Sequence, residues 1–321
     1  MNRARAGKRN SWRDFDAERL RGLEIDPQLD FRSLLEQAVR VGAMTASGQS
    51  RPNWTFRAGC KTGIRSKAGA DRAGTQEIAM KKEDVLRQYT TPTGAPAFVP
   101  GPHRFTSREY LNITYRTDRE ALVKQVPEPL EIDEPLVRFE VMNMPDTTGY
   151  GSYVECGQAA VVRHGEERGE YIIGMYLDNL PAIAAGRELS AFPKKLGSAK
   201  LFVDSDTLVG TLDYGVLSVA RATMGYKHKP YDLEKAREEI CVPTYMLKIL
   251  PSYTKRPRIC ELVRTQITNI EVKGAWRGPA RLQLFEHVLA PLADLPVREI
   301  VSATHILTDL TLSPATVIYD Y

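Results

Sequence analysis

A succession of short strand-like segments, separated by turns rich in glycine, dominates the sequence after residue 80. Within them apolar and polar residues alternate, as in β-strands with one buried face. The strand pattern is found at 109–115, 136–142, 152–163, 170–177, 200–203, 208–212, 216–223, 246–250, 259–270 and 301–312. Helical patterns are short, at 82–89, 118–126, 181–188, 232–240 and 282–290. This pattern predicts one β-rich α+β domain, closed or strongly curved so that its strand edges are covered.

The first 79 residues follow a different pattern. They hold 15 Lys and Arg against 9 Asp and Glu, so the net charge of +4 of the whole chain belongs to this segment. They show little periodicity, and we expect a basic, disordered extension in front of a folded domain over 80–321. Because Met80 stands at the boundary, translation could begin there. The basic charge is a weak argument for a nucleic-acid partner, so we expect none.

Missing motifs argue against a dinucleotide-binding enzyme, a P-loop NTPase and an α/β-hydrolase. There is no GxGxxG opening a helix, no phosphate-binding GxxxxGK loop and no GxSxG. The four cysteines are widely spaced, which predicts neither a disulfide framework nor a metal site and is typical of a protein in the reducing cytoplasm. No apolar run approaches the ~20 residues that span a bilayer, so we expect no membrane partner.

An adjacent lysine pair, Lys194 and Lys195, stands in an apolar setting within GRELSAFPKKLGSAKL (186–201). Phe192 precedes the pair by two residues and Leu196 follows it. Paired lysines are most often solvated surface residues. A lysine amine in apolar surroundings, however, loses the hydration that favours its charged form, and it can then act as a nucleophile. The pair is therefore the first candidate for chemistry.

Charged residues also stand inside strand patterns, where a charge is costly unless it is paired. Alternation places Arg138 and Glu140 on the same face of one predicted strand. Glu155 lies in the next predicted strand, and Arg108 comes just before the first. Each residue taken alone is better explained by an outward-facing salt bridge. Only a shared site would give them a common role.

Over residues 80–321 the sequence closely resembles the acetoacetate decarboxylase family. Long segments carry the resemblance: REYLNITYRTD (108–118), VPEPLEIDEPLVRFE (126–140), MYLDNLPAIAAGRELSAFPKKLG (175–197), LFVDSDTLVGTLDYG (201–215), ATMGYKHK (222–229), ICVPTYMLKILP (240–251) and RLQLFEHVLAPLADLPVREIVS (281–302). The first 79 residues have no counterpart in that family.

The resemblance implies the reaction and its residues. The family converts acetoacetate to acetone and carbon dioxide without a metal or an organic cofactor. Its Schiff-base lysine, the first after the proline, falls on Lys194, with Lys195 as its neighbour. Its active-site arginine falls on Arg108, and its two active-site glutamates fall on Glu140 and Glu155.

The resemblance also implies a cone-like, closed antiparallel β-barrel, assembled into a large homo-oligomer, a dodecamer. The partner it implies is a small-molecule β-keto acid. One position departs from members that carry tyrosine before the proline, because Phe192 keeps the ring without the hydroxyl. That change affects the fine tuning of the pocket rather than the chemistry.

A protonated imine withdraws the electrons that carbon dioxide leaves behind, so the family's chemistry needs an unprotonated lysine amine. If the lysine pair is extended, the two side chains point to opposite faces. We therefore expect burial of Lys194, more than the charge of Lys195, to disfavour its ammonium form. Arg108 could bind the substrate carboxylate or pair with Glu155. Glu140 and Glu155 could transfer protons, orient Arg108 or crowd the substrate's negative charge.

Two other functions stay open at this point. A relative on the same scaffold could use the lysine for an aldol or dehydration reaction on larger keto acids, although the retained Arg108, Glu140 and Glu155 count against it. A non-catalytic β-barrel could also bind small molecules, with Lys194 as a buried anchor.

Overall fold

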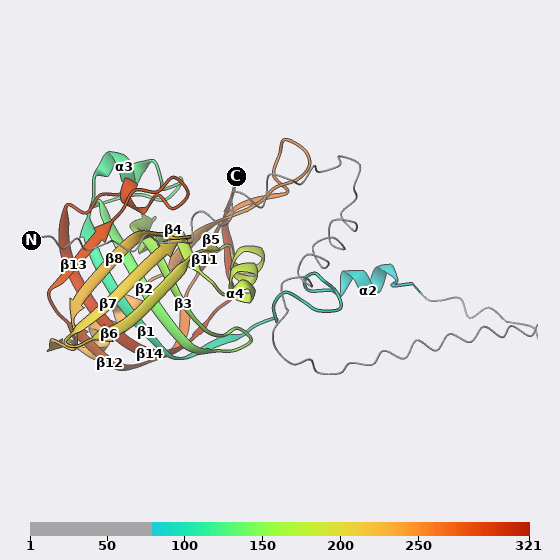
Figure 1. Cartoon of the computed structure of the whole chain (residues 1–321). Coiled ribbons are helices and arrows are strands. Elements are labelled where there is room, and N and C mark those ends of the chain that lie inside the picture. Colours follow the sequence, from blue (N-terminus) through green and yellow to red (C-terminus); the bar gives the residue numbers. More distant parts are fainter. Residues whose placement is uncertain (1–78) are drawn as a thin grey trace, which may run out of the picture. The chain divides into compact units, whose positions relative to one another are not determined.

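The computed structural model describes residues 79–321 (Figure 1). The extension predicted over 1–79 falls, except for its last residue, outside the described part of the chain. The helical elements are α2 (Lys82–Leu86), α3 (Arg119–Val123), α4 (Leu180–Ala185), α5 (Leu233–Ile240), the π-helical turn η1 (Gly186–Ser190) and the 3-10 turn η2 (Leu292–Asp294). The strands are β1 (His103–Arg116), β2 (Leu136–Thr147), β3 (Gly151–His164), β4 (Glu167–Leu177), β5 (Lys194–Leu196), β6 (Ser198–Asp204), β7 (Thr207–Tyr214), β8 (Leu217–Gly225), β9 (Lys229–Pro230), β10 (Thr244–Leu250), β11 (Ile259–Thr265), β12 (Ile267–Arg277), β13 (Ala280–Leu284), β14 (Glu299–Leu312) and β15 (Thr316–Asp320).

The strands form two sheets. The larger has the order β15-β11-β10-β4-β3-β2-β1-β14-β12-β9, with β5 paired to β4, and the smaller has the order β13-β8-β7-β6. All the pairings are antiparallel except those of β4 with β5 and with β10. The prediction of a β-rich domain with few helices is confirmed. Among the described residues no pairing joins the end strands β15 and β9, so the closed barrel is not confirmed.

The large sheet is buried on both faces in its central strands. On β2, Phe139 and Val141 belong to one hydrophobic core, which also contains residues of the small sheet. A Cβ placed on Gly210 of β7 would lie only 2.8 Å from a methyl carbon of Val141, so the two sheets approach closely. Arg138 and Glu140 alternate with these residues, and both line a cavity on the other face. Strand alternation therefore separates the core from the pocket.

The helix expected over 282–290 is wrong. The segment begins as strand β13, which pairs antiparallel with β8. Leu282 is buried, whereas its neighbours Arg281 and Gln283 are exposed, which is the alternation of a strand. Pairing with β8 overrode a weak helical pattern. The longest described helix is α5, with 8 residues. No helix in the described part is long and apolar enough to cross a membrane.

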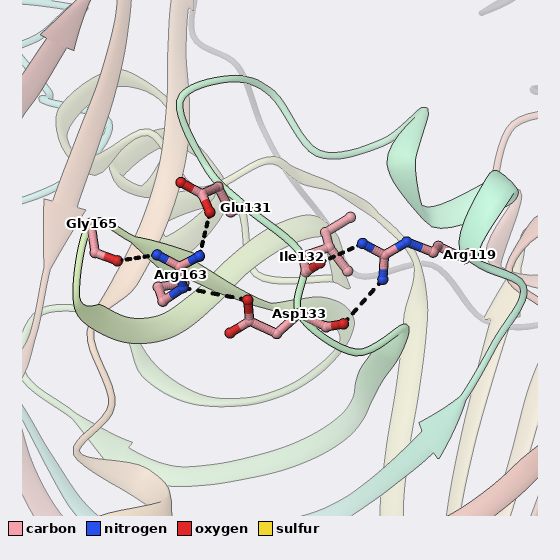
Figure 2. Close-up of polar contacts among 6 residues, drawn as sticks. All are labelled: Arg119, Glu131, Ile132, Asp133, Arg163 and Gly165. Carbon is pink, nitrogen blue, oxygen red and sulfur yellow. Dashed lines mark hydrogen bonds and ion pairs between the residues drawn. The ribbon is translucent and has the colours of Figure 1, made fainter.

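Two arginines hold an exposed loop in place, Arg163 from the end of the β3–β4 hairpin and Arg119 from α3 (Figure 2). The surface arginine cluster comprises Arg119, Glu131, Ile132, Asp133, Arg163 and Gly165. The Arg163 guanidinium donates to the carbonyl of Gly165 and to the carboxylates of Glu131 and Asp133. Arg119 donates to the carbonyl oxygens of Ile132, at 2.7 Å, and Asp133, at 3.1 Å. Arg163 thus ties the loop to the large sheet, at a place in the sequence well before the lysine pair.

Candidate active site

A cavity of about 80 Å³ opens on the face of the large sheet opposite the small sheet. It has room for several waters or one small organic acid. Strands β1 to β5 supply its charged groups, and residues after α5 supply part of its apolar wall. Four of the five residues expected from sequence line it, namely Arg108, Glu140, Glu155 and Lys194. Lys195 does not.

Both lysines of the pair lie on the short strand β5, which runs parallel to β4, and their side chains point to opposite faces of it. Lys194 is 8% exposed and points into the cavity. Lys195 points the other way, where its Nζ donates to the carbonyl of Leu289 and lies 5.2 Å from the centre of the Tyr214 ring. The expectation that the two side chains diverge, with Lys194 buried, is confirmed.

The turn before β5 is shaped to accept the Lys194 side chain. A Cβ on Gly186 would lie 2.6 Å from the Cδ of Lys194, so any larger residue there would displace the lysine. Ala191, which ends the turn, has a left-handed φ of 74°. Arg187, within the turn, donates to the carbonyl of Lys194 at 3.2 Å. The turn therefore fixes both the backbone and the direction of Lys194.

Glu155 is the immediate polar neighbour of the buried lysine. Its Oε2 lies 2.7 Å from the Nζ of Lys194, and the glutamate is only 2% exposed. The rings of Phe192 and Tyr153 lie 5.4 and 5.9 Å from the same nitrogen. The lysine therefore sits among rings, as the sequence suggested, but with a carboxylate beside it. That carboxylate is placed to take a proton from the ammonium group and release the free amine.

Arg108 enters the cavity without a carboxylate partner. No ion pair with a carboxylate forms at Arg108 in the described residues. Its guanidinium carbon lies 5.1 Å from the ring centre of Phe105 and 4.7 Å from that of Tyr110. One terminal nitrogen contacts the Met142 sulfur at 2.7 Å, and the buried Nε has no hydrogen-bond partner. Of the two roles open from sequence, this geometry favours binding a ligand carboxylate over pairing with Glu155.

Glu140 shares a guanidinium with a second buried glutamate. Its Oε1 lies 3.9 Å from Nη1 of Arg138, which confirms that the two residues share a face. The other terminal nitrogen of Arg138 lies 3.0 Å from Oε1 of Glu170 on β4. Burial raises the pKa of Glu140, although Arg138 and Arg108 act in the opposite direction. Burial likewise raises the pKa of Glu170. These carboxyls therefore hold protons more readily than carboxyls in water.

The cavity holds equal numbers of basic side chains and carboxyls. There are three basic side chains and three carboxyls: Lys194, Arg108, Arg138, Glu140, Glu155 and Glu170. A proton that passes from Lys194 to one of these carboxyls stays in the cavity, so the net charge of the site is unchanged by the transfer.

Sequence reasoning missed Glu170, Tyr153 and Gly186. Glu170 had a weak signal, because it opens an apolar strand as a lone charge, EYIIG. Nothing local distinguishes Tyr153 or Gly186, since their positions matter only through Lys194. In the described part of the chain, no group of three or more His, Cys, Asp or Glu side chains is arranged to hold a metal ion.

Comparison with known proteins gives consistent matches. The model of the acetoacetate decarboxylase family matches residues 88–321. An acetoacetate decarboxylase of Streptomyces nogalater is 68% identical, over 75% of this chain and 99% of that protein. A solved acetoacetate decarboxylase structure is 63% identical, with a TM-score of 0.74 over 75% of this chain and 99% of the other. Another, from Legionella pneumophila, is 44% identical, with a TM-score of 0.70 over 74% and 96% of the two chains.

Proposed function

This chain belongs to the acetoacetate decarboxylase family, and we propose that it converts acetoacetate to acetone and carbon dioxide through a Schiff base on Lys194. One observation carries the proposal. The buried Nζ of Lys194 lies 2.7 Å from the Glu155 carboxylate, in a cavity that also holds the guanidinium of Arg108, which pairs with no carboxylate among residues 79–321. This combination suits an anionic ketone, because it offers a nucleophile, a proton acceptor and an anion-binding group together.

In the first step, Arg108 binds the substrate carboxylate and Glu155 takes a proton from Lys194. The free amine attacks the ketone carbon, and the ketone oxygen leaves as water with two protons, one from the attacking nitrogen and one returned by the carboxyl of Glu155. Lysine ammonium and ketone thus become a protonated imine and water, with the net charge unchanged. The imine is joined to a carboxylate two bonds away, which is the arrangement that loses carbon dioxide readily.

In the second step, the bond to the carboxyl carbon breaks. Its electron pair moves into the protonated imine and forms a neutral enamine, and carbon dioxide leaves. Once the carboxylate has left as carbon dioxide, the ion pair with Arg108 no longer exists, so Arg108 binds the substrate but not the product. The apolar wall of the cavity favours neutral products over the charged reactant.

In the third step, the enamine carbon takes a proton and water then releases acetone from Lys194. Overall, one acetoacetate anion and one proton become acetone and carbon dioxide, so every turnover consumes a proton. Glu140 is the carboxyl we assign to donate it, because burial raises its pKa and keeps it protonated at higher pH than an exposed glutamate.

Borohydride trapping tests this function. Reduction in the presence of acetoacetate should leave a stable adduct on Lys194, located by mass spectrometry of peptides, and the untrapped enzyme should release acetone. An adduct without carbon dioxide release would favour an aldol or dehydration reaction on the same scaffold. If no adduct forms, Lys194 is only an anchor in a binding protein, and the proposal fails.

The finer expectations about assembly and location remain part of this proposal. We propose that the protein assembles into a homo-oligomer, specifically a dodecamer. Exposed apolar side chains support assembly, such as Val216, 98% exposed, and Val288, 90% exposed. Light scattering after gel filtration tests it. The free thiols of Cys156, Cys241 and Cys260 fit a cytoplasmic location. We also propose that residues 80–321 form a closed, cone-like barrel.

A further inference from the structure

One buried guanidinium in the cavity faces two buried carboxyls. Arg138 lies 3.0 Å from Glu170 and 3.9 Å from Glu140, and both side chains are nearly inaccessible to water. Arg138 is the only cation within 4 Å of either carboxyl in the described part of the chain. Burial disfavours two carboxylates beside one guanidinium, so one proton is shared by the pair of carboxyls. The shorter contact stabilises the carboxylate of Glu170 more than that of Glu140. The shared proton is therefore held preferentially on Glu140.

We propose that Glu170 and Arg138 are positioning residues, which keep the carboxyl of Glu140 in its acid form and aimed at the substrate. Glu170 does this by occupying the guanidinium, so that Arg138 does not form a full ion pair with Glu140. The inference rests on the proposed decarboxylase function and deepens it, because it explains how a buried carboxyl beside an arginine can still donate a proton.

The position of Arg138 is fixed by contacts outside the cavity. Its Nη1 donates to the carbonyl of Glu239 near the end of α5, at 3.1 Å. The Glu239 side chain is itself held by Asn112, at 3.2 Å, and by Thr304, at 2.7 Å. These bonds resist a swing of the guanidinium toward Glu140. The 3.9 Å separation is therefore built into the fold rather than set by a loose side chain.

The charged and titratable groups around Glu140 come from six elements. They are Arg108 and Tyr110 on β1, Arg138 on β2, Glu155 and Cys156 on β3, Glu170 on β4, Lys194 on β5 and Glu239 on α5. The nearby cations lower the pKa of Glu140, whereas burial and the nearby carboxylates raise it. Glu170 acts on Glu140 through the cation that they share. Removing its carboxylate should therefore let Arg138 ionise Glu140.

Two substitutions should move the same pH limb in opposite directions. Glu170→Gln leaves Arg138 with Glu140 as its carboxylate partner, which lowers the pKa of Glu140, so kcat should fall at a lower pH than in the parent enzyme. Above about pH 7 we expect a loss of about 10- to 100-fold, converging on the parent value at lower pH. Arg138→Gln removes the cation, so the same limb should move to higher pH.

The failing step has its own signature. With Glu170→Gln at high pH, carbon dioxide should appear as a burst of about one molecule per active site, followed by slower turnover, because protonation of the enamine comes after carbon dioxide release. Borohydride reduces the imine and not the enamine, so trapping is done with acetone, which forms the imine on Lys194 directly, and the yield of that adduct should remain near the parent level. Trapping thus separates this inference from the proposed function, since loss of the adduct in the parent enzyme would refute the function itself.

Glu167→Gln is the matched control. Glu167 lies on the same strand and also pairs with an arginine, Arg264, at 2.7 Å, but on the surface. Its activity relative to the parent should be the same at every pH. The inference is overturned if Glu170→Gln and Arg138→Gln move the limb in the same direction or not at all. It is also overturned if Glu170→Gln lowers kcat by the same factor at every pH.

Discussion

The surface arginine cluster and the cavity use the same residue types for different ends. Arg163 in the surface arginine cluster has a side chain that is 33% exposed, and it donates to three acceptors (Figure 2). Arg138 in the cavity is 11% exposed and must serve two carboxyls. A pair of charges 4 Å apart interacts by about 1 kcal/mol in water, but by about 4 kcal/mol near a protein surface of lower effective dielectric.

The two regions differ in the free-energy cost of removing one charged side chain. On the surface, water and salt replace a lost partner, so the surface arginine cluster stabilises a loop and little else. In the cavity the charged side chains are nearly inaccessible to bulk water, so a lost partner is not replaced by solvent and salt. That restriction bears on the chemistry, because burial raises the pKa values of Glu140 and Glu170.

The largest expected effect comes from Lys194. Lys194→Arg keeps the positive charge but cannot form a Schiff base, so kcat should fall by at least ~10⁴-fold and the borohydride adduct should disappear. Lys195→Arg is the matched control. Because Lys195 points toward Leu289 and away from the cavity, we expect a loss of less than about 10-fold. Comparable losses for the two variants would contradict the divided orientation of the pair.

Glu155 and Glu140 should fail at different steps. Glu155→Gln removes the carboxylate beside Lys194, so adduct formation should slow by about 100-fold. Glu140→Gln should form the adduct at close to the parent rate but turn over slowly, with a burst of carbon dioxide. Rapid mixing with acetone followed by a borohydride quench measures adduct formation, and carbon dioxide release from acetoacetate measures the burst. Equal slowing of adduct formation in the two variants would show that the assignment of roles is wrong.

Arg108 should matter only for ligands with a carboxylate. Arg108→Gln should lower kcat/KM for acetoacetate by about 100-fold, since a hydrogen-bonded charge contributes roughly 1.5–3 kcal/mol. Trapping of acetone, which has no carboxylate, should be unaffected. Arg104→Gln is a suitable control, because Arg104 lies on the same strand and is exposed. An unchanged kcat/KM in Arg108→Gln would remove this arginine from substrate binding.

The smallest effect is expected in the surface arginine cluster. Arg163→Gln should leave kcat unchanged and lower Tm by no more than about 2 °C, and that deficit should shrink as NaCl rises from about 0.05 to about 0.5 M. Arg138→Gln should lower Tm further, by a margin that salt does not change, since its partners are buried. A salt-independent deficit in Arg163→Gln would remove the contrast between the two regions.

Much of the strand pattern and the site followed from local sequence. Alternation placed Arg138 and Glu140 on one face, and the extended lysine pair divided as the geometry of a strand requires. The resemblance supplied the roles that we propose for Lys194, Arg108, Glu140 and Glu155. These properties are local or inherited, so a single chain is enough to recognise them.

What only the tertiary structure decided is which distant groups meet. Glu155 is brought to Lys194 because β3 and β5 both pair with β4. Arg138 meets Glu170 across β3, and Gly186 is needed only because the lysine stem passes over it. Residues 282–284 pair with β8 as the end of β13 instead of beginning a helix. Sequence fixes which face of a strand a side chain occupies, but the register and order of strands decide which side chain it faces there.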